Sequence, residues 1–317
     1  MASTEILSAS SEGIRRAAEL LAQGGLVALP TETVYGLGGD ARNDHAVARI
    51  FEAKGRPHFN PLIVHVPDLE TAGRYAVLTP TARALAAQFW PGPLTMVLPL
   101  REEAGLSPLV TAGNDTVAIR VPAHPVARAL LAAFAGPVAA PSANPSGRVS
   151  PTRARHVIDG LSGRIEAVID GGACAVGVES TILSLDPPQL LRPGGVAAEA
   201  LEAALGLTLP TGGNAQKPNA PGQLLSHYAP DAPVRLNTEA PSAGETYVTF
   251  GTPPASGQLT LSPTGDLTEA AANLFHILRE ADRVAGPGGR ISFAPVPERG
   301  LGRAINDRLR RAAAPRP

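Results

Sequence analysis

Short apolar segments alternate with amphipathic helical patterns over the first 185 residues, and this alternation constrains the fold more than any other feature. Segments with the length and composition of buried strands lie at residues 26–30, 62–66, 94–100, 117–121, 137–141, 167–170 and 180–185. Between them, helical patterns occur at residues 14–22 (with Ser11 as the expected cap), 44–53, 79–89, 124–134 and 152–158. This order predicts an α/β domain with a helix-backed sheet.

A break in composition divides the chain. Residues 211–222 are rich in glycine, proline and asparagine and have no periodicity, which is typical of a linker. Beyond it, the segments VRL and YVTF, a helix at 267–282 and a final basic helix indicate a second, smaller α/β unit. We therefore expect a large domain over residues 1–205, which is long enough to hold an active site, a linker over 206–231 and a small domain over 232–317.

Charge and cysteine content exclude several classes of protein. The formal net charge of −1 argues against a general nucleic-acid coat protein, although a local basic cleft stays compatible with it. A single cysteine, Cys174, rules out an intramolecular disulfide and a cysteine-rich zinc site, and it favours a reducing cytoplasm. The N-terminus lacks the order of a signal peptide, and no apolar run is long enough to span a bilayer. We expect a cytoplasmic protein without a membrane partner.

The segment KGRPHFNPLIVHV places two cations, Lys54 and Arg56, just before a turn stiffened by prolines. Only two of the 27 basic residues are lysines, and a lysine offers a compact charge that suits a single phosphate oxygen. An anion between the cations would relieve their repulsion; a solvated surface pair is the alternative. In the same segment, Asn60 can donate and accept hydrogen bonds. His65 interrupts an apolar strand, where a structural role is more common than a catalytic one.

Two polar segments follow predicted strands. In LPTETVYGLGGDA, Thr31, Glu32 and Thr33 come at the end of a strand, where hydroxyls can orient a small ligand or merely cap the loop. The GLGG that follows fits neither a dinucleotide fingerprint nor a P-loop, and we interpret it as a glycine loop. In APSANPSGRVSPT, the side chains of Ser142, Asn144 and Ser150 could form a phosphate or ribose cradle; a rigid polar turn is the alternative.

Other candidate residues are arginines, hydroxyls and an aromatic pair. Arg120 interrupts the apolar strand VAIRV, where an arginine requires an anion or strong acceptors. Further candidates of this kind are Thr116, Ser180 and Arg192. His227 and Tyr228, in SHYAP just beyond the linker, could fold over a bound base or exclude water.

Motifs of covalent and metal catalysis are missing from the sequence. It contains no HExxH, no cysteine-pair metal site and no GxSxG, and its seven histidines are scattered. The chain therefore favours a reaction that is positioned electrostatically, without a covalent nucleophile or a protein-ligated metal.

Taken together, the motifs resemble the YrdC-like family in its longer, two-domain form, the threonylcarbamoyl-AMP synthases. The matching motifs occur in the family's order and are PTETVYGLG, KGRP with NPL, FWPGPLT, AIRVP, APSANPSG, STI and LRPG. HYAP and the C-terminal stretch extend the resemblance almost to the end of the chain. It implies an α/β fold with a large twisted mixed sheet and helices, plus a smaller C-terminal Rossmann-like α/β domain.

The resemblance also implies a reaction. L-threonine, bicarbonate or CO₂, and ATP with Mg²⁺ would give threonylcarbamoyl-adenylate and pyrophosphate in a nucleotidyl transfer. The product would pass to the tRNA threonylcarbamoyl transferase machinery, which forms N6-threonylcarbamoyladenosine; weak direct binding of tRNA is left open.

The family's site residues carry over onto matching positions. The KxR and SxN signature corresponds to Lys54, Arg56, Ser142 and Asn144, expected at the reaction centre. Threonine would be held by Thr33, His65, Arg120 (pairing its carboxylate), the backbone of Ala140, and Ser180. ATP would be held by Arg56, Asn60, Thr116, Ser142, Ser150, Arg192, His227 and Tyr228, with the linker closing over the site.

Two alternatives remain at this stage. An RNA-binding module could use the same basic surface, although the neutral net charge and the lack of interleaved aromatic and basic residues argue against it. A YrdC-like domain could also serve another carbamoyl-adenylate pathway, such as maturation of hydrogenase cofactors. The absence of zinc-finger cysteines and of an acylphosphatase-like segment disfavours that pathway.

Overall fold

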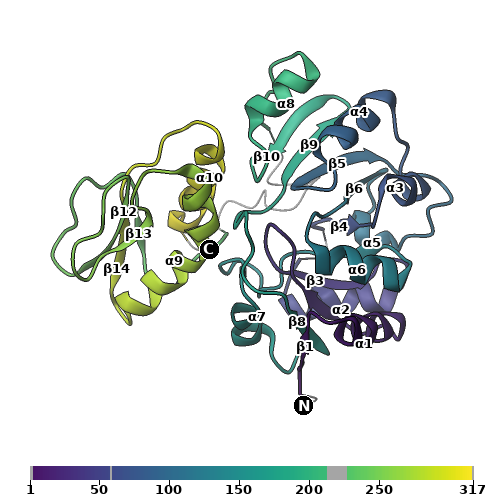
Figure 1. Cartoon of the computed structure of the whole chain (residues 1–317), viewed down its shortest axis with the longest axis horizontal. Helices are drawn as coiled ribbons and strands as arrows, with labels where there is room; N and C mark the ends of the chain where they lie inside the picture. The colour runs from purple at the N-terminus through teal and green to yellow at the C-terminus, as the bar shows by residue number, and fades with distance from the viewer. Residues whose placement is uncertain (1–2, 58, 213–226, 316–317) are drawn as a thin grey trace.

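A computed structural model describes residues 3–57, 59–212 and 227–315. These residues form two α/β units, each built around its own sheet (Figure 1). The larger unit contains β1 (Glu5–Ser8), α1 (Ser11–Ala22), β2 (Val27–Leu29), β3 (Gly36–Asp40), α2 (Asp44–Lys54), β4 (Ile63–His65), α3 (Leu69–Tyr75), α4 (Pro80–Phe89), β5 (Leu94–Pro99), α5 (Pro108–Thr111), β6 (Thr116–Arg120), α6 (Pro125–Phe134), β7 (Val138–Ala139), α7 (Ala154–Leu161), β8 (Ala167–Asp170), β9 (Thr181–Leu185), β10 (Pro188–Arg192) and α8 (Ala198–Leu205).

The large sheet has ten strands in the order β1-β8-β2-β3-β7-β4-β6-β5-β9-β10. It is mixed, because β4 pairs with β6 in parallel whereas β3 and β4 both run antiparallel to β7. Successive residues of a strand face opposite sides. Accordingly, Val27 and Leu29 of β2 pack with α1 and α6, while Ala28 between them packs in the core that contains α2 and α7. Helices thus cover both faces, which confirms the predicted fold class.

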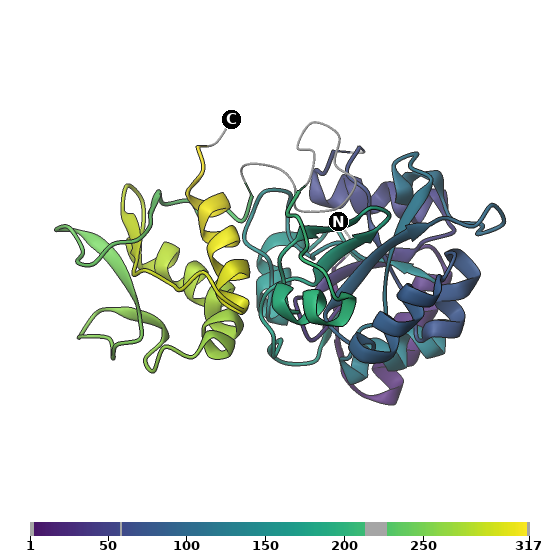
Figure 2. The same ribbon diagram turned by 90° about the horizontal axis from the view of Figure 1, so that it is seen from above.

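The smaller unit contains β11 (Val234–Arg235), β12 (Glu245–Phe250), β13 (Leu259–Ser262), α9 (Leu267–Ala285), β14 (Arg290–Phe293) and α10 (Leu301–Ala313). Its four strands are all parallel, in the order β11-β14-β12-β13. Both views place α9 and α10 on the side of this sheet that faces the larger unit (Figures 1 and 2).

Several elements differ from the sequence-based prediction. The glycine-rich GLGGD is strand β3 and not a loop; a Cβ on Gly38 would lie 2.9 Å from Cγ1 of Val138, so glycine allows this close approach between strands. The cap of α1 is Ser10, whose side chain accepts from the Gly13 amide, and not Ser11. Strands β1, β10, β13 and β14 and helices α3, α5 and α8 were not anticipated, since most are short or lie in polar segments.

The described residues were also compared with what a membrane span and a metal site require. Among the described residues, no helix combines the length and apolar character that a bilayer crossing needs. The same residues include no group of three or more His, Cys, Asp or Glu side chains placed to hold a metal ion. Cys174 is buried and unpaired with another cysteine.

Candidate active site

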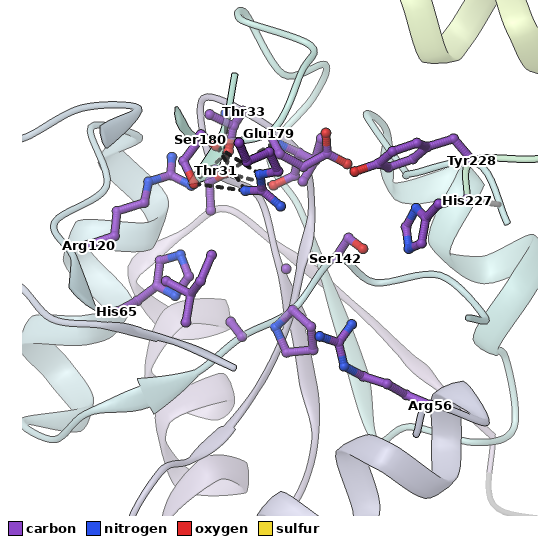
Figure 3. A pocket seen from close by; sticks show the side chains of 16 residues that line it. Thr31, Thr33, Arg56, His65, Arg120, Ser142, Glu179, Ser180, His227 and Tyr228 are labelled. Carbon is purple, nitrogen blue, oxygen red and sulfur yellow. Dashed lines mark hydrogen bonds between the residues drawn. The ribbon is translucent and has the colours of Figure 1, made fainter. Parts of the chain in front are cut away.

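A polar pocket opens where β4, β6 and β7 end and the segments 30–36 and 179–180 meet (Figure 3). Its lining combines cations, hydroxyls and small residues: Thr31, Thr33, Val34, Gly36, Arg56, Ile63, His65, Arg120, Ala140, Pro141, Ser142, Glu179, Ser180, Arg192, His227 and Tyr228. Figure 3 shows Arg120 and His65 on one side of the pocket and Arg56, His227 and Tyr228 on the other, with Ser142 between them. The pocket therefore has two chemically distinct ends.

The first end is organised by Arg120, the last residue of β6. Its Nη2 donates to Oε1 of Glu32 at 2.6 Å, and its Nη1 donates to Oγ1 of Thr33 at 2.9 Å. Its Nε donates to the carbonyl of Gly92 at 3.2 Å. A guanidinium has five N–H donors, so two remain after these bonds. Arg120 is thus held rigidly while keeping the capacity to bind one carboxylate.

Glu32 is the anchor that orients Arg120. Its second carboxylate oxygen accepts from the Ala123 amide at 3.0 Å. Burial raises the pKa of Glu32, but the charge and hydrogen bond of Arg120 outweigh burial, so that the net pKa lies below its ordinary value. This role of Glu32 could not be predicted from its motif, because its pairing with Arg120 joins residues 88 positions apart.

His65 lies beside Arg120, since β4 and β6 pair in the register His65 with Arg120. Burial and the Arg120 charge lower the pKa of His65 to about 3, so the imidazole is neutral. Its Nδ1 is buried and has no hydrogen-bond partner among the described residues. His65 thus places a neutral imidazole in the wall of the pocket. Ser180 is nearby in the lining, where its hydroxyl shares a 2.7 Å hydrogen bond with that of Thr95.

The second end gathers buried cations. Arg56 is 8% exposed, and its hydrogen bonds to the carbonyls of Asn60 and Pro61 are long, at 3.1 to 3.4 Å. Burial and the charge of Arg192 lower the pKa of Arg56 to about 10, so it remains cationic at neutral pH. Arg192 donates to the carbonyl of Ser180 at 2.9 Å and to its hydroxyl at 3.2 Å. Two buried, mutually repelling guanidinium groups make this end receptive to an anion.

Lys54 supports the pocket from behind. It is the last residue of α2, and Gly55 ends the helix in the left-handed conformation that favours glycine. The Lys54 ammonium donates to the carbonyls of Ser142 at 2.6 Å and Asn144 at 2.5 Å. Burial and the neighbouring Arg56 lower the pKa of Lys54 well below its usual range. In this geometry Lys54 shapes the loop that presents Ser142 to the pocket.

Asn144 acts on the same loop. Its side-chain amide donates to the carbonyls of Pro145 at 2.8 Å and Arg148 at 2.9 Å. The SxN half of the signature therefore combines a serine that lines the pocket with an asparagine that holds the loop.

Five predicted residues lie outside the described lining, namely Lys54, Asn60, Thr116, Asn144 and Ser150. Asn60 is buried, and its Oδ1 has no partner among the described residues. Thr116 begins β6, where it pairs with Pro99 of β5. Ser150 donates to the carboxylate of Glu179 at 2.5 Å. Of the five, Asn60 contacts Arg56 directly, since its carbonyl accepts from the guanidinium.

His227 and Tyr228 complete the wall at the Arg56 end. Of the predicted linker, residues 213–226 lie outside the described part of the chain, but this pair is described and buried. The two rings meet edge to face with centroids 4.1 Å apart. Burial lowers the pKa of His227 to about 3, so its imidazole is neutral. The pair adds two buried, uncharged rings to the wall of the pocket.

Glu179 is the functional candidate that sequence reasoning missed. It is the acidic side chain in the described lining, and it faces Arg192 and Arg308. Burial raises its pKa, but the charges of Arg308 and Arg192 and the hydrogen bond of Ser150 outweigh burial, so the net pKa is lowered. The glutamate that precedes STILSL could have been noticed as a charge at a strand end, but its partners are distant in sequence.

Comparisons with known proteins identify the family. A family model described as "Telomere recombination" matches residues 19–194, and a second, "Threonylcarbamoyl-AMP synthase, C-terminal domain", matches residues 196–314. The threonylcarbamoyl-AMP synthase of Bacillus subtilis (strain 168) is 42% identical, over 99% of this chain and 96% of its own. This chain belongs to the threonylcarbamoyl-AMP synthase family. The family expected from the ordered motifs is thus confirmed.

A second relative and a solved structure support the same family. The threonylcarbamoyl-AMP synthase of Pyrococcus abyssi (strain GE5 / Orsay) is 42% identical over 95% of this chain and 94% of its own. A crystal structure of P. abyssi Sua5 in complex with L-threonine matches with a TM-score of 0.89 and 41% identity, over 98% of both chains. The similarity of this threonylcarbamoyl-AMP synthase family member to its relatives therefore extends through both α/β units.

Proposed function

We propose that this protein makes threonylcarbamoyl-AMP and pyrophosphate from L-threonine, bicarbonate or CO₂, and ATP. The observation that carries the proposal is one pocket with two cationic ends, Arg120 at one and Arg56 with Arg192 at the other. The reaction brings together two anionic substrates, an amino acid whose carboxylate stays free and a polyphosphate, and each negative charge needs its own cation. Family membership over the whole chain supports the same assignment.

The Arg120 end is proposed to bind threonine. Arg120 would pair with the substrate carboxylate through the two N–H groups that Glu32, Thr33 and Gly92 leave available. The neutral His65 would contact the substrate's hydroxyl or amine, and Thr33, Ala140 and Ser180 would complete the pocket. Keeping His65 neutral avoids a second cation beside the amine, which must be uncharged to react.

The Arg56 end is proposed to bind ATP. Arg56 and Arg192 would neutralise the phosphates, and Ser142 would donate to them from the loop that Lys54 and Asn144 hold. Asn60, Thr116 and Ser150, with His227 and Tyr228, would form the rest of the nucleotide site. With these assignments, Lys54 and Asn144 act on the substrate through the loop.

The chemistry follows from this division. The uncharged threonine amine would take up the one-carbon unit as a carbamate, whose oxygen attacks the α-phosphorus while pyrophosphate leaves. Catalysis would come from alignment and charge neutralisation by Arg56 and Arg192. Both carboxylate oxygens of Glu179 already accept hydrogen bonds, so the described lining offers no open carboxylate ligand. We therefore assign Mg²⁺ to the ATP phosphates, where it would add to charge neutralisation.

The adenylate is a reactive mixed anhydride, so exclusion of water matters. The buried His227–Tyr228 pair would keep water from it. A transferase acting on tRNA adenosine would consume the product, and we propose a cytoplasmic location, which the single cysteine supports. The proposed domain limits are 1–205, 206–231 and 232–317, supported by the packing of Ala198 and Leu201 of α8 in the core of the large sheet.

The direct test is pyrophosphate release from ATP with Mg²⁺ and bicarbonate, measured with and without L-threonine. We expect release that requires threonine and falls when serine replaces it. An Arg120→Ala variant serves as the control for the amino-acid pocket. Release that ignores threonine would refute the assignment.

A further inference from the structure

A buried arginine of the smaller unit reaches the wall of the pocket. The side chain of Arg308, in α10, is 0% exposed, and its Nε donates to Oε2 of Glu179 at 3.0 Å. Its Nη1 donates to the carbonyl of Pro193 and to the carboxylate of Asp307, whereas its buried Nη2 has no hydrogen-bond partner among the described residues. Since Glu179 lines the pocket, a residue 129 positions further along the chain contacts its wall.

The same guanidinium faces the ring of Tyr228. Its Cζ lies 5.5 Å from the ring centroid, a distance suited to a cation–π contact. Phe275 of α9 stacks on the same ring at 5.4 Å between centroids. Tyr228 has a φ of 61°, in the left-handed region that a bulky residue occupies only when its surroundings hold it there. Arg308 and Phe275 are part of those surroundings.

The contact is part of a packed interface between the two units. Val34, Val149 and Val178 of the larger unit belong to the same apolar core as Phe275. At Gly177 the backbones approach so closely that a Cβ would lie 2.3 Å from the carbonyl oxygen of Ala271. Arg308 is therefore inserted in a fixed position.

Glu179 explains why an arginine is needed there. Its carboxylate is buried at the phosphate-binding end, with one oxygen on Ser150 and the other on Arg308. A buried carboxylate without a compensating cation would attract Arg192 and repel the phosphates. Arg308 adds a second cation to Arg192 beside Glu179, so less of the negative charge of Glu179 is left to repel the phosphates.

We propose that Arg308 is a positioning residue for ATP, so that the C-terminal unit contributes to the nucleotide site through Glu179 and Tyr228. Arg308 shares the negative charge of Glu179 with Arg192, so that Arg192 keeps more of its positive charge for the phosphates, and it holds the Tyr228 ring against the pocket. Its contacts among the described residues do not include Arg120, Thr33 or His65, so we expect ATP binding to depend on it more than threonine binding does. This inference rests on the proposed function.

The test compares steady-state kinetics of four full-length variants. For Arg308→Gln, we expect the KM for ATP to rise about tenfold while the KM for threonine stays within about twofold. The double variant Glu179→Gln/Arg308→Gln should recover much of the ATP affinity, because it removes the uncompensated charge. Arg308→Lys, which keeps the charge, should be intermediate. Arg310→Gln is the matched control, since Arg310 lies on the same helix in an exposed pair with Glu298.

Three results would overturn the inference. They are an unchanged KM for ATP in Arg308→Gln, an equal rise in both KM values, and a double variant that is no better than Arg308→Gln. If Arg308→Gln does not fold by circular dichroism, Arg308→Lys decides the matter by the same comparison of KM values. Calorimetric binding of a non-hydrolysable ATP analogue tests Arg308 even if wild-type protein releases no pyrophosphate, an outcome that would refute the proposed function instead.

Discussion

Replacing Lys54 with methionine tests whether this lysine shapes the site or touches the phosphates. The substitution keeps the length and apolar stem of the side chain and removes only the ammonium. In the structure, that ammonium donates to the carbonyls of Ser142 and Asn144 at 2.6 and 2.5 Å. The Asn144 carbonyl would thus lose its donor, whereas the Ser142 carbonyl would keep the Asn144 amide, which donates to it at 3.0 Å.

The magnitude follows from the Asn144 carbonyl. A buried acceptor left unpaired costs about 1–3 kcal/mol. Part of this is offset, because burial lowers the pKa of Lys54 and so already destabilises the charged form in the folded state. We expect a net loss of about 1 kcal/mol, which for a domain of this size is a fall in Tm of about 2–4 °C.

The assay is thermal unfolding without ligand, followed by calorimetric ATP binding. Glu52→Met is the matched control, because Glu52 is exposed on the same helix. We expect Lys54→Met to lower both Tm and ATP affinity, since the Ser142 loop loses its support. An unchanged Tm together with lost ATP affinity would refute this reasoning and assign Lys54 to direct phosphate contact.

Three further predictions follow from the site and the fold. Arg120→Lys should raise the KM for threonine at least about tenfold and leave the KM for ATP unchanged. The reason is that an ammonium cannot bind Glu32, Thr33 and a substrate carboxylate at the same time, as the planar guanidinium can. Equal effects on both KM values would contradict this. The pKa of His65 is lowered from 6.5 in the unfolded chain to about 3 in the folded protein. As the pH falls below about 6.5, the unfolded state therefore binds a proton that the folded state does not bind. His65 alone should reduce the free energy of unfolding by about 2 kcal/mol at pH 5. Urea unfolding at pH 5 and 7 should therefore show less pH dependence in His65→Gln than in wild type, and identical slopes would argue against a buried neutral imidazole. Finally, Gly194→Ala should destabilise the protein by several kcal/mol (about 3 or more), since the added Cβ would lie within 2.4 Å of the Glu179–Thr181 backbone. Gly73→Ala is the control, because its Cβ would meet only the end of the Leu78 side chain, at 3.3 Å. Thermal unfolding should show that Gly73→Ala is tolerated and Gly194→Ala is not.

The local elements of the fold could largely be predicted from the sequence. Apolar runs such as residues 94–100 and amphipathic stretches such as 44–53 fold as expected, since periodicity is a local property of the chain. Prediction failed where tertiary packing overrides local preference. The glycine-rich β3 has low intrinsic strand propensity, and only its close approach to Val138 and Leu29 makes glycine suitable there.

The candidate site divides in the same way. The ordered motifs were sufficient to predict the family and to select ten residues that line one pocket, because motif spacing is written in the sequence. What each side chain touches was decided only by the tertiary structure. Lys54 turned out to hold carbonyls 88 and 90 positions away, and Glu179 to be paired with Arg308, 129 positions away. Such pairs form only when the sheet and the two units bring distant segments together, and burial then makes their charges depend on one another.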